Sequence, residues 1–533
     1  MADEKTIKLI HKTFNIYGLS ITKKLSTIVA KHLQSNPELD PESWLTRVVE
    51  QILTQNLTTP QVDIEHIKLA IKECIKPEST LQETETVLNV IDAFTVPKVV
   101  YDLNKQKYVI EKADFDLFPD AKHKSLVFKE RLDLLWYKTL KHPIFAPSKL
   151  GRTDENKLQL VPIEYLLSEC KTKNVCIMGL LSQITEGHFY LEDYGGSVKL
   201  NLKKASFNSS LVVEGSIVLA TGKYSDKVLH VDNIDFPPHE APDESRVNFG
   251  DANVFGGPHP LSLRFSDKLK LFEDSNSANF FVFISEFWVD NEVVLSKFEI
   301  LLSGFSESPP VAIVLCGHFS NSTSNVASAK KLREGFKKVA GIISRYPLIH
   351  QNTKFIIVPG PFDLSAPKIL PRAPLPKYIM EDFLKVVPGT YLATNPCRIQ
   401  YCTKEIVVFR ENMLSKLSRN TLCYPKKEID ENGQERGEKV YEAFAKSIIR
   451  QSHLTPLLFS TIPVYWKHDH ALQLYPTPDL LVVADDFQSY TTKYNECQVT
   501  NPGSFVKSNF SFKVYCPKEN LVEDCDIPDD TEL

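Results

Sequence analysis

Five side chains of this 533-residue sequence have the types and positions that metal or proton-transfer chemistry requires. Glu286, His318, Asp363 and Asp485 each come shortly after an apolar run of strand length, and His453 follows a helical pattern. Open α/β sheets bind their ligands at the carboxyl ends of the strands, and imidazole and carboxylate suit several divalent metals. A mononuclear metal site formed by Glu286, His318, Asp485 and His453 is therefore one hypothesis. Hydrogen-bonded or solvated side chains at loop tips are the interpretation that we favour.

The composition excludes a mainly electrostatic grip on nucleic acid. The chain has 62 Lys and Arg against 67 Asp and Glu, which gives a net charge of −5 with His neutral. Tight, nonspecific DNA binding depends on neutralising phosphates with Lys and Arg, which this balance disfavours. At about 150 residues per domain, the length predicts three or four domains.

The ten cysteines have neither zinc-finger nor redox spacing. No C-x-x-C pair occurs, and Cys397 and Cys402 are five residues apart, so we expect both to be buried structural thiols. The sequence shows no signal peptide and no apolar run of about 18 residues. These features predict an intracellular, soluble protein with free thiols and no structural zinc.

Hydropathy patterning predicts a multidomain, mixed fold. Apolar residues recur at helical spacing near the N-terminus, where Asp40-Pro41-Glu42 marks a helix start and nine basic residues balance nine acidic ones through residue 75. A neutral bundle suits protein contacts. The predicted segments are 1–75, a helical bundle; 76–155, a connector with one helix at Lys122–Lys141; 156–244, a β-barrel; 245–518, an α/β domain; and 519–533, an acidic tail.

The barrel segment alternates apolar and polar residues with period two. Five short strands of this kind fit a barrel of the oligonucleotide/oligosaccharide-binding (OB) type. The predicted strands are Val175–Ser182, Gly187–Glu192, Ser197–Leu202, Ser216–Gly222 and Lys227–Ile234.

Aromatic residues of this barrel raise the question of base stacking. Alternation puts Phe189 and Leu191 on one face of their strand and Tyr190 on the other, so at least one ring belongs to the core. Residues 171–240 hold seven lysines against eight acids, which leaves no electropositive track for a phosphate backbone. We therefore favour a protein partner for the barrel over a nucleic-acid strand.

The α/β segment alternates buried-strand signals with helical patterns. Lys426–Lys439 is rich in charge and is predicted to be a mobile insertion, and Tyr465 with Trp466 fits either an interface anchor or a core role. The predicted elements are strands at Phe280–Ile284, Ala312–Cys316, Phe355–Val358, Arg398–Tyr401, Ile406–Arg410 and Leu480–Ala484, with helices near Ala329–Ser344 and Glu438–Gln451.

A ten-residue string, Thr394–Thr403 (TNPCRIQYCT), carries the strongest resemblance to a known family. With it the chain resembles the calcineurin-like metallophosphoesterase fold and, more closely, that fold's inactive relatives, the B subunits of replicative DNA polymerases, in particular those of the epsilon polymerase. Further matching pieces, in the expected order, are Phe255–Pro258, Glu405–Glu411, His453–Leu457, Pro463–Trp466, Pro478–Val482 and Asn501–Phe505.

The resemblance implies a lost active site. Active enzymes of this fold hold two cations about 3.5–4 Å apart with the motifs D-x-H, G-D-x-x-D, G-N-H-(D/E) and G-H-x-H. Aligned by strand, these motifs have lost a histidine ligand, the bridging carboxylate, the amide ligand and both final histidines. The indole that replaces one imidazole cannot bind metal. We expect no catalytic, cofactor-binding or metal-binding residue and no hydrolysis. The four aligned stretches are Glu286–Trp288, Gly317–Asn321, Gly360–Asp363 and Ala484–Phe487.

The resemblance also implies a function, that of a noncatalytic scaffold subunit of the nuclear polymerase epsilon holoenzyme. Barrel and phosphoesterase-like domain would bind the C-terminal, zinc-motif region of the catalytic subunit. Residues 1–75 resemble the C-terminal domain of AAA+ proteins and would bind the GINS part of the replicative helicase. Small histone-fold subunits would complete the assembly, with indirect or weak DNA contact.

Two alternatives remain from the sequence. One is a metal-dependent phosphodiesterase or exonuclease that uses Glu286, His318, Asp363 and Asp485 as ligands. The other is a barrel that binds single-stranded DNA.

Overall fold

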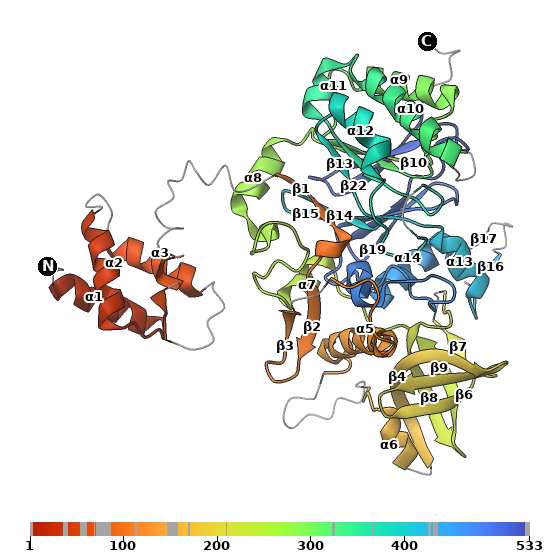
Figure 1. The fold of residues 1–533 in the computed structure, drawn as a ribbon. Helices are drawn as coiled ribbons and strands as arrows, with labels where there is room; N and C mark the ends of the chain where they lie inside the picture. Colours follow the sequence, from red (N-terminus) through yellow and green to blue (C-terminus); the bar gives the residue numbers. More distant parts are fainter. Residues whose placement is uncertain are drawn as a thin grey trace. The chain divides into compact units, whose positions relative to one another are not determined.

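The chain forms two compact units, Met1–Val87 and Leu88–Leu533 (Figure 1). No helix of the described part is long and apolar enough to cross a membrane. The computed structural model describes residues 4–35, 41–53, 61–64, 66–68, 70, 87–111, 115–146, 158–168, 171–208, 211–321, 326–364, 367–424, 428–429, 435–436 and 438–527.

The first unit is helical, as the apolar spacing predicts. Its helices are α1 (Glu4–Ile16), α2 (Lys23–Ser35) and α3 (Pro41–Leu53), and Pro41 stands at the predicted helix start. Each helix places one apolar stripe in a shared core that includes Phe14, Val29, Trp44 and Val48.

The barrel contains the five strands that alternation predicts. Its strand order is β6-β5-β4-β8-β9-β7, and an additional β6–β9 pairing closes it. Leu191 is fully buried and Phe189 packs against the same core, whereas Tyr190 is only half-buried. The strands are β4 (Lys171–Thr185), β5 (His188–Asp193), β6 (Gly196–Asn201), β7 (Ser206–Phe207), β8 (Ile217–Ser225) and β9 (Val228–Asp235).

The α/β part consists of two facing six-stranded sheets. Phe281 and Tyr401, one from each sheet, pack edge to face with ring centroids 5.3 Å apart. The first sheet has the order β13 (Thr390–Leu392), β12 (Lys354–Val358), β11 (Ala312–Cys316), β10 (Phe281–Ser285), β21 (Phe512–Cys516) and β22 (Leu521–Cys525); the second has β1 (Leu88–Asp92), β14 (Cys397–Tyr401), β15 (Lys404–Arg410), β18 (Leu480–Ala484), β20 (Cys497–Asn501) and β19 (Tyr490–Tyr494).

Helices cover the outer faces of both sheets. One hydrophobic core lies between the sheet that contains β10 and the helices α9 (Glu292–Gly304), α10 (Val326–Ile343) and α12 (Lys377–Val386). A second core lies between the sheet that contains β15 and the helices α13 (Met413–Asn420) and α14 (Val440–Gln451). Shorter elements are η2 (Ala93–Thr95), β2 (Lys98–Asp102), β3 (Lys107–Glu111), α6 (Ile163–Ser168), α7 (Pro242–Val247), η3 (Leu263–Phe265), α8 (Asp267–Ser275), α11 (Pro347–Asn352), β16 (Glu428–Ile429), β17 (Glu435–Arg436) and η4 (Trp466–Leu472).

Two edge strands lie outside the predicted α/β segment. Strand β1 comes from the predicted connector and pairs antiparallel with β14, and β22 comes from the predicted acidic tail and pairs with β21. Edge strands tolerate polar and charged residues, which hides them from a hydropathy pattern. Most of the predicted insertion Lys426–Lys439 and the end of the tail, 528–533, lie outside the described residues.

The two cysteines expected to be structural are buried, free thiols. Cys397 and Cys402 are buried and lie in or beside β14. Burial raises the pKa of Cys402 to about 12, so its thiol is unreactive at neutral pH. Tyr465 and Trp466, just before and at the start of η4, are half-buried, and both of their proposed roles stay open.

Helix α5 (Lys122–Lys141) joins the barrel to the α/β part. Leu132 and Leu135 pack against the barrel, whereas Leu134 packs against the β2–β3 hairpin and the α/β part. The buried Arg131 donates from Nε and Nη2 to the two carboxylate oxygens of Asp469 in η4, at 2.9 and 2.5 Å. The predicted connector therefore contains the element that makes barrel and sheets one body.

Removing the charge of Asp469 should destabilise this joint. We expect Asp469→Asn to lower the free energy of unfolding by about 3–5 kcal/mol, because it leaves the Arg131 guanidinium buried and unpaired. Urea denaturation at pH 7.5 measures the loss. The matched control is Asp382→Asn, whose partner Arg333 lies at the surface, and it should leave the midpoint unchanged. Equal denaturation midpoints for both variants would show that the Arg131–Asp469 pair does not stabilise the contact between α5 and η4.

The contribution of two buried histidines to stability should fall as the pH drops below about 6.5. Burial lowers the pKa of His453, and it lowers that of His470 to about 4, whereas both imidazoles titrate near 6.5 in the unfolded chain. Between these values each histidine favours unfolding, because it binds a proton only in the unfolded chain. Asp485 opposes this effect, because its raised pKa lets the folded chain take up a proton over the same range. We therefore expect His470→Gln to lose less stability than wild type between pH 7 and pH 5, by about 2 kcal/mol. An equal loss in the two proteins would contradict the assignment.

Candidate functional site

The carboxyl ends of strands from both sheets converge on one arginine. Arg410, the last residue of β15, is fully buried. Its guanidinium donates to the backbone oxygens of Gly317 and Ala484, the latter at 2.9 Å, to Asn412 Oδ1 at 2.7 Å and to Glu286 Oε1 at 3.3 Å. Three of the four stretches that align with metal-binding motifs thus bind the guanidinium of Arg410, through Glu286, Gly317 and Ala484, and the fourth, Gly360–Asp363, lies beside it.

The ten-residue string positions this arginine. Asn395 Nδ2 donates to the backbone oxygen of Arg410 at 2.7 Å, and the backbone N–H of Arg410 donates to Asn395 Oδ1 at 3.0 Å. Arg398, in the same string, is buried and donates to the backbone oxygens of Phe255 and Gln473. Burial lowers the pKa of Arg398 to about 10, so it remains a cation. The string is therefore structural in this chain, and its Asn395 holds Arg410 in place.

Glu286 and His318 are neighbours at the site. Glu286 Oε1 lies 4.0 Å from His318 Nδ1, and Glu286 Oε2 lies 3.1 Å from Lys507 Nζ. Burial raises the pKa of Glu286, but the neighbouring His318 and Ser504 and the charges of Arg410 and Lys507 outweigh this effect and hold the pKa at about 2. This carboxylate is therefore permanently ionised and already balanced by cations of the chain.

Glu286 also adopts a left-handed backbone conformation, with φ of +55°. A non-glycine residue in this region costs energy, and such strain persists mostly at ligand-binding sites. Glu286 directly follows β10, and its carboxylate pairs with Arg410.

Both carboxylate oxygens of Asp363 accept hydrogen bonds from the backbone. Oδ1 accepts from the N–H of Phe319 and Oδ2 from the N–H of Gly360, both at 2.7 Å. Its approach to Gly317 is so close that a Cβ at 317 would lie 1.7 Å from Oδ2, which explains the glycine there. Burial raises the pKa of Asp363, opposed by these two hydrogen bonds. Asp363 therefore ties the loops after β11 and β12 together.

Asp485 and His453 serve other contacts. Asp485 Oδ2 accepts from the N–H of Leu414 at 2.8 Å at the start of α13, and burial together with the hydrogen bond to Asp486 raises its pKa to about 7. His453 lies elsewhere, with Nε2 3.2 Å from Asp469 Oδ2 in the α5 joint. The structure thus brings Glu286 and His318 together and sends His453 to a different cluster.

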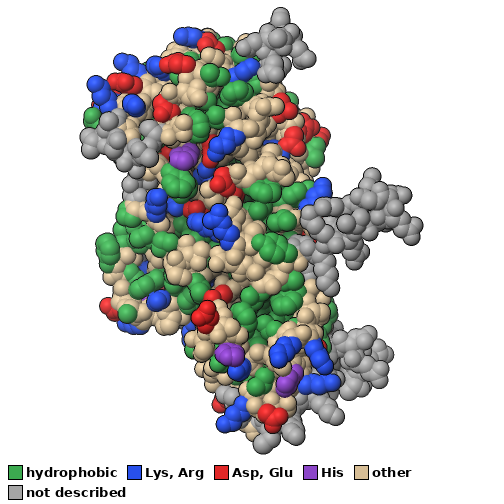
Figure 2. Space-filling model, turned by 90° about the vertical axis from the view of Figure 1, so that its right-hand side faces the viewer, with side chains coloured by type: hydrophobic (Ala, Val, Ile, Leu, Met, Phe, Trp, Pro, Cys, Tyr) green, Lys and Arg blue, Asp and Glu red, His purple; other side chains and the backbone are tan. Residues whose placement is uncertain are grey.

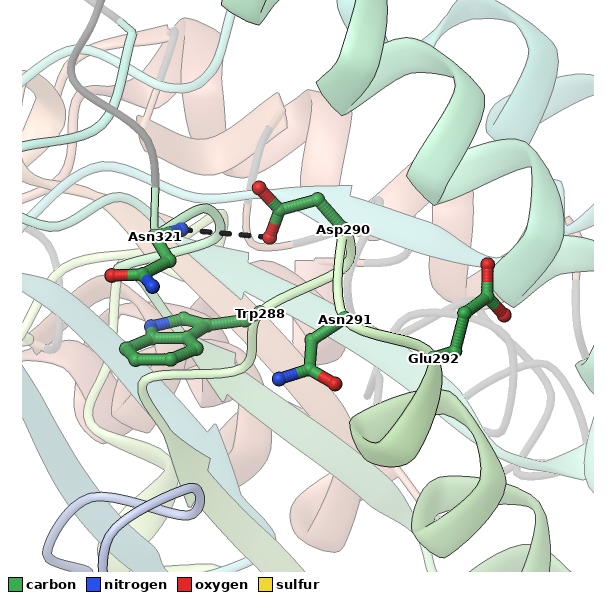
Figure 3. Close-up of a pocket in the computed structure, with 5 residues that line it drawn as sticks. All are labelled: Trp288, Asp290, Asn291, Glu292 and Asn321. Atoms are coloured by element: carbon green, nitrogen blue, oxygen red, sulfur yellow. Dashed lines mark hydrogen bonds between the residues drawn. The ribbon is translucent and has the colours of Figure 1, made fainter.

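No group of three or more His, Cys, Asp or Glu within the described residues could hold a metal ion. A nearby open pocket of about 420 Å³ is lined by Trp288, Asp290, Asn291, Glu292 and Asn321 (Figure 3). Asn321 donates its backbone N–H to Asp290 Oδ1 at 3.5 Å, and the indole nitrogen of Trp288, which is buried, finds no acceptor in the described part of the chain. An indole, amides and carboxylates line this pocket, and none of the candidate ligands Glu286, His318 and Asp485 is among its lining residues.

Arg410 has the largest role at the site, and sequence reasoning assigned it none. It ends the apolar run Ile406–Phe409, and a charge directly after such a run signals either a strand that leaves the core or a buried cation with dedicated acceptors. The sequence does not show which acceptors exist, because Gly317, Ala484 and Glu286 lie far from it along the chain.

Comparison with known proteins decides the family. Family models match in order: "DNA polymerases epsilon N terminal" at residues 3–74, "DNA polymerase epsilon subunit 2-like, OB-fold domain" at 121–238, and the model that describes the B subunit of DNA polymerases alpha and epsilon at 281–492. DNA polymerase epsilon subunit 2 of Bos taurus and of Homo sapiens are each 38% identical over 98% of this chain and 99% of their own length. The chain belongs to the B-subunit family of DNA polymerase epsilon.

This family membership confirms the resemblance of the ten-residue string and the multidomain mixed fold. The B subunit of Arabidopsis thaliana DNA polymerase epsilon is 32% identical over 97% of this chain and 98% of its own length. A solved archaeal phosphodiesterase covers 46% of this chain and 98% of its own at 9% identity and a TM-score of 0.26, a similarity too low to carry an argument. The chain is a noncatalytic, accessory subunit of DNA polymerase epsilon. The absence of metal-binding and catalytic residues stays a prediction.

Replacing Arg410 should destabilise the α/β part. We expect Arg410→Met to lower the free energy of unfolding by about 3–5 kcal/mol, because Glu286 and two strand-end carbonyls lose their cationic donor. The double variant with Glu286→Gln should lose less than the sum of the single variants, by about 1–3 kcal/mol. Chemical denaturation of the four proteins gives this coupling.

Arg345→Met is the matched control, since Arg345 pairs with Glu299 at the surface and its loss should leave the denaturation midpoint unchanged. Strict additivity of the Arg410 and Glu286 substitutions would show that the guanidinium does not balance the buried carboxylate.

Proposed function

We propose that this accessory subunit is a scaffold of the nuclear polymerase epsilon holoenzyme. Its second unit would bind the C-terminal region of the catalytic subunit, and its first unit would bind the GINS part of the replicative helicase. The observation that carries the proposal is the position of the buried Arg410 guanidinium between the strand ends, where it binds Glu286 and the backbone oxygens of Gly317 and Ala484.

The rigid joint made by α5 supports a scaffold. Arg131 and Lys138 of this helix reach Asp469 and Ser452 of the α/β part, and Gln451 of α14 exchanges two hydrogen bonds with the backbone of Ile217 in the barrel, at 2.9 and 2.7 Å. Barrel and sheets therefore present one continuous surface to a partner.

Apolar side chains remain exposed on that surface. Leu103, Phe115, Phe118, Val247 and Leu271 are each at least 65% exposed. Figure 2 shows hydrophobic side chains gathered over the middle of one face. Large exposed apolar side chains are typical of protein interfaces. They favour the proposed contact with the catalytic subunit.

The first unit supports a separate contact. Its helices have their own core, and Ile16 and Leu53 remain 70% and 46% exposed at the ends of α1 and α3. The proposal that GINS is its partner, and that small histone-fold subunits join the same holoenzyme, derives from family resemblance. The near-neutral charge of this segment suits a protein partner.

Deleting the first unit should separate the two contacts. A chain that begins at Leu88 should co-purify with the C-terminal region of the catalytic subunit, like wild type, and should lose binding to purified GINS. Affinity capture with each partner, on full-length and shortened chains, measures both.

The isolated first unit serves as the reciprocal control and should retain GINS alone. Loss of both partners from the shortened chain, or retention of both, would contradict the assignment of one partner to each unit.

A further inference from the structure

Helix α8 exposes apolar side chains and buries a charged one. Of its nine residues, Leu269 and Glu273 are buried, whereas Leu271 and Phe272 are 66% and 39% exposed. A surface helix normally turns its apolar residues to the core and its charged residues to water. Helix α8, at the edge of the second unit (Figure 1), inverts part of this pattern, which is typical of a contact surface for a partner.

Polar contacts hold α8 on the second unit. Glu273 accepts a hydrogen bond from Thr403 Oγ1 at 2.8 Å and lies 3.6 Å from Nζ of Lys404, the first residue of β15. The backbone oxygen of Asp274 accepts from Lys518 Nζ at 3.2 Å. Because the buried carboxylate fixes the inner side of the helix, the apolar side chains on its outer side stay at the surface.

The exposed apolar residues of α8 flank a single base. Successive residues of an α-helix are rotated by about 100°, which places Lys268 between Leu271 and Phe272 around the helix axis. Lys268 is exposed and forms no ion pair with any residue that the structure describes. Phe265, which precedes the N-cap residue Ser266, is 58% exposed and adds an apolar side chain at this end of the helix. We call Lys268, Leu271 and Phe272 the α8 outer surface.

The other exposed charges of α8 lie on the opposite side of Leu271. The same rotation places Asp267, Lys270 and Asp274 there, and all three are exposed. One side of the helix thus has two acids and one base, and the side of Phe272 has one base. A partner that complements both sides has an acid near Lys268 and a base near the two aspartates.

Neighbouring elements add little net charge to this surface. Arg264 of η3 pairs with Asp243 and with Asp479, at 2.6 Å in each case. The turn between β21 and β22, beyond the C-terminal end of α8, has Lys518 and Glu519, one charge of each sign. The charge pattern that a partner meets is therefore mainly that of α8 itself.

We propose that an amphipathic helix of the catalytic subunit's C-terminal region docks on the α8 outer surface. This inference rests on the proposed binding of that region to the second unit, and it names the surface and the kind of segment that meet. The apolar side of the docked helix covers Leu271 and Phe272, one of its acids pairs with Lys268, and one of its bases lies near Asp267 and Asp274.

The dimensions and charges of α8 select this occupant. Nine residues make a helix about 14 Å long, which accommodates two to three turns of a helix packed along it. Apolar residues at spacings of three and four on one side are the usual means by which such a helix binds. A nucleic acid fits poorly, because its phosphates would meet the exposed carboxylates of Asp267 and Asp274.

The test measures binding of the purified C-terminal region of the catalytic subunit to the full chain by isothermal titration calorimetry. The variant is Leu271→Gln with Phe272→Gln, since glutamine suits a helix and removes the apolar contact. The matched control is Val293→Gln with Leu348→Gln, whose side chains are 56% and 48% exposed on α9 and α11. The α8 variant should lose at least about tenfold in affinity, and the control should bind as wild type does. Both should keep the wild-type melting temperature.

A charge reversal tests the orientation of the docked helix. Lys268→Glu should lose about threefold to tenfold in affinity at about 50 mM salt and less at about 500 mM, because salt screens an ion pair at the rim of an interface. Lys331→Glu, at an exposed lysine of α10, is the matched control and should bind as wild type does at both salt concentrations.

Hydrogen–deuterium exchange of the complex locates the contact. The amides of residues 265–276 should exchange more slowly in the complex than in the free chain, and those of residues 345–353 should exchange equally in both. Four results would overturn the inference while wild-type binding upholds the proposed function. They are an α8 variant that binds as wild type does, an equal loss in its control, a Lys268→Glu chain without a salt-dependent loss, and unchanged exchange at residues 265–276. Absence of binding by the wild-type chain would instead contradict the proposed function itself.

Discussion

A fully buried guanidinium, that of Arg410, is the constraint on which the α/β part depends. The free-energy cost of removing such a charge from water is several kcal/mol unless acceptors surround it. Arg410 meets this requirement with acceptors from the ends of β10, β11 and β18 and with Asn412 beside it. All of these acceptors can reach the guanidinium only if the two sheets keep their relative position. The hydrogen bonds of Arg410 therefore fix one sheet against the other.

The same constraint gives the ten-residue string a physical meaning. The side chain of Asn395 forms hydrogen bonds with both the backbone N–H and the backbone oxygen of Arg410. Arg398 donates to backbone oxygens of two other segments. The guanidinium of Arg410 is the cation to which Glu286 and the strand-end carbonyls of Gly317 and Ala484 are bonded. These groups are therefore occupied by contacts within the chain. Arg131 repeats the arrangement between α5 and η4.

Sequence reasoning predicted what depends on local pattern. The observed bounds of β11, β18 and α5 match the predicted ones, because apolar periodicity and turn residues mark such elements locally. Strands β1 and β22 were missed because their pairing partners, not their hydropathy, make them strands. The placement of Glu286 and His318 at adjacent strand ends was correct, whereas the pairing of His453 with Asp469 depends on tertiary packing.

The most direct test of a scaffold without a metal centre is elemental analysis of this chain in complex with the C-terminal region of the catalytic subunit, on the peak fraction of a sizing column. The account predicts a one-to-one complex whose metal content equals that of the catalytic-subunit region alone. Stoichiometric Mn²⁺ or Zn²⁺ on this chain by itself, with phosphodiester hydrolysis that His318→Ala abolishes, would contradict it.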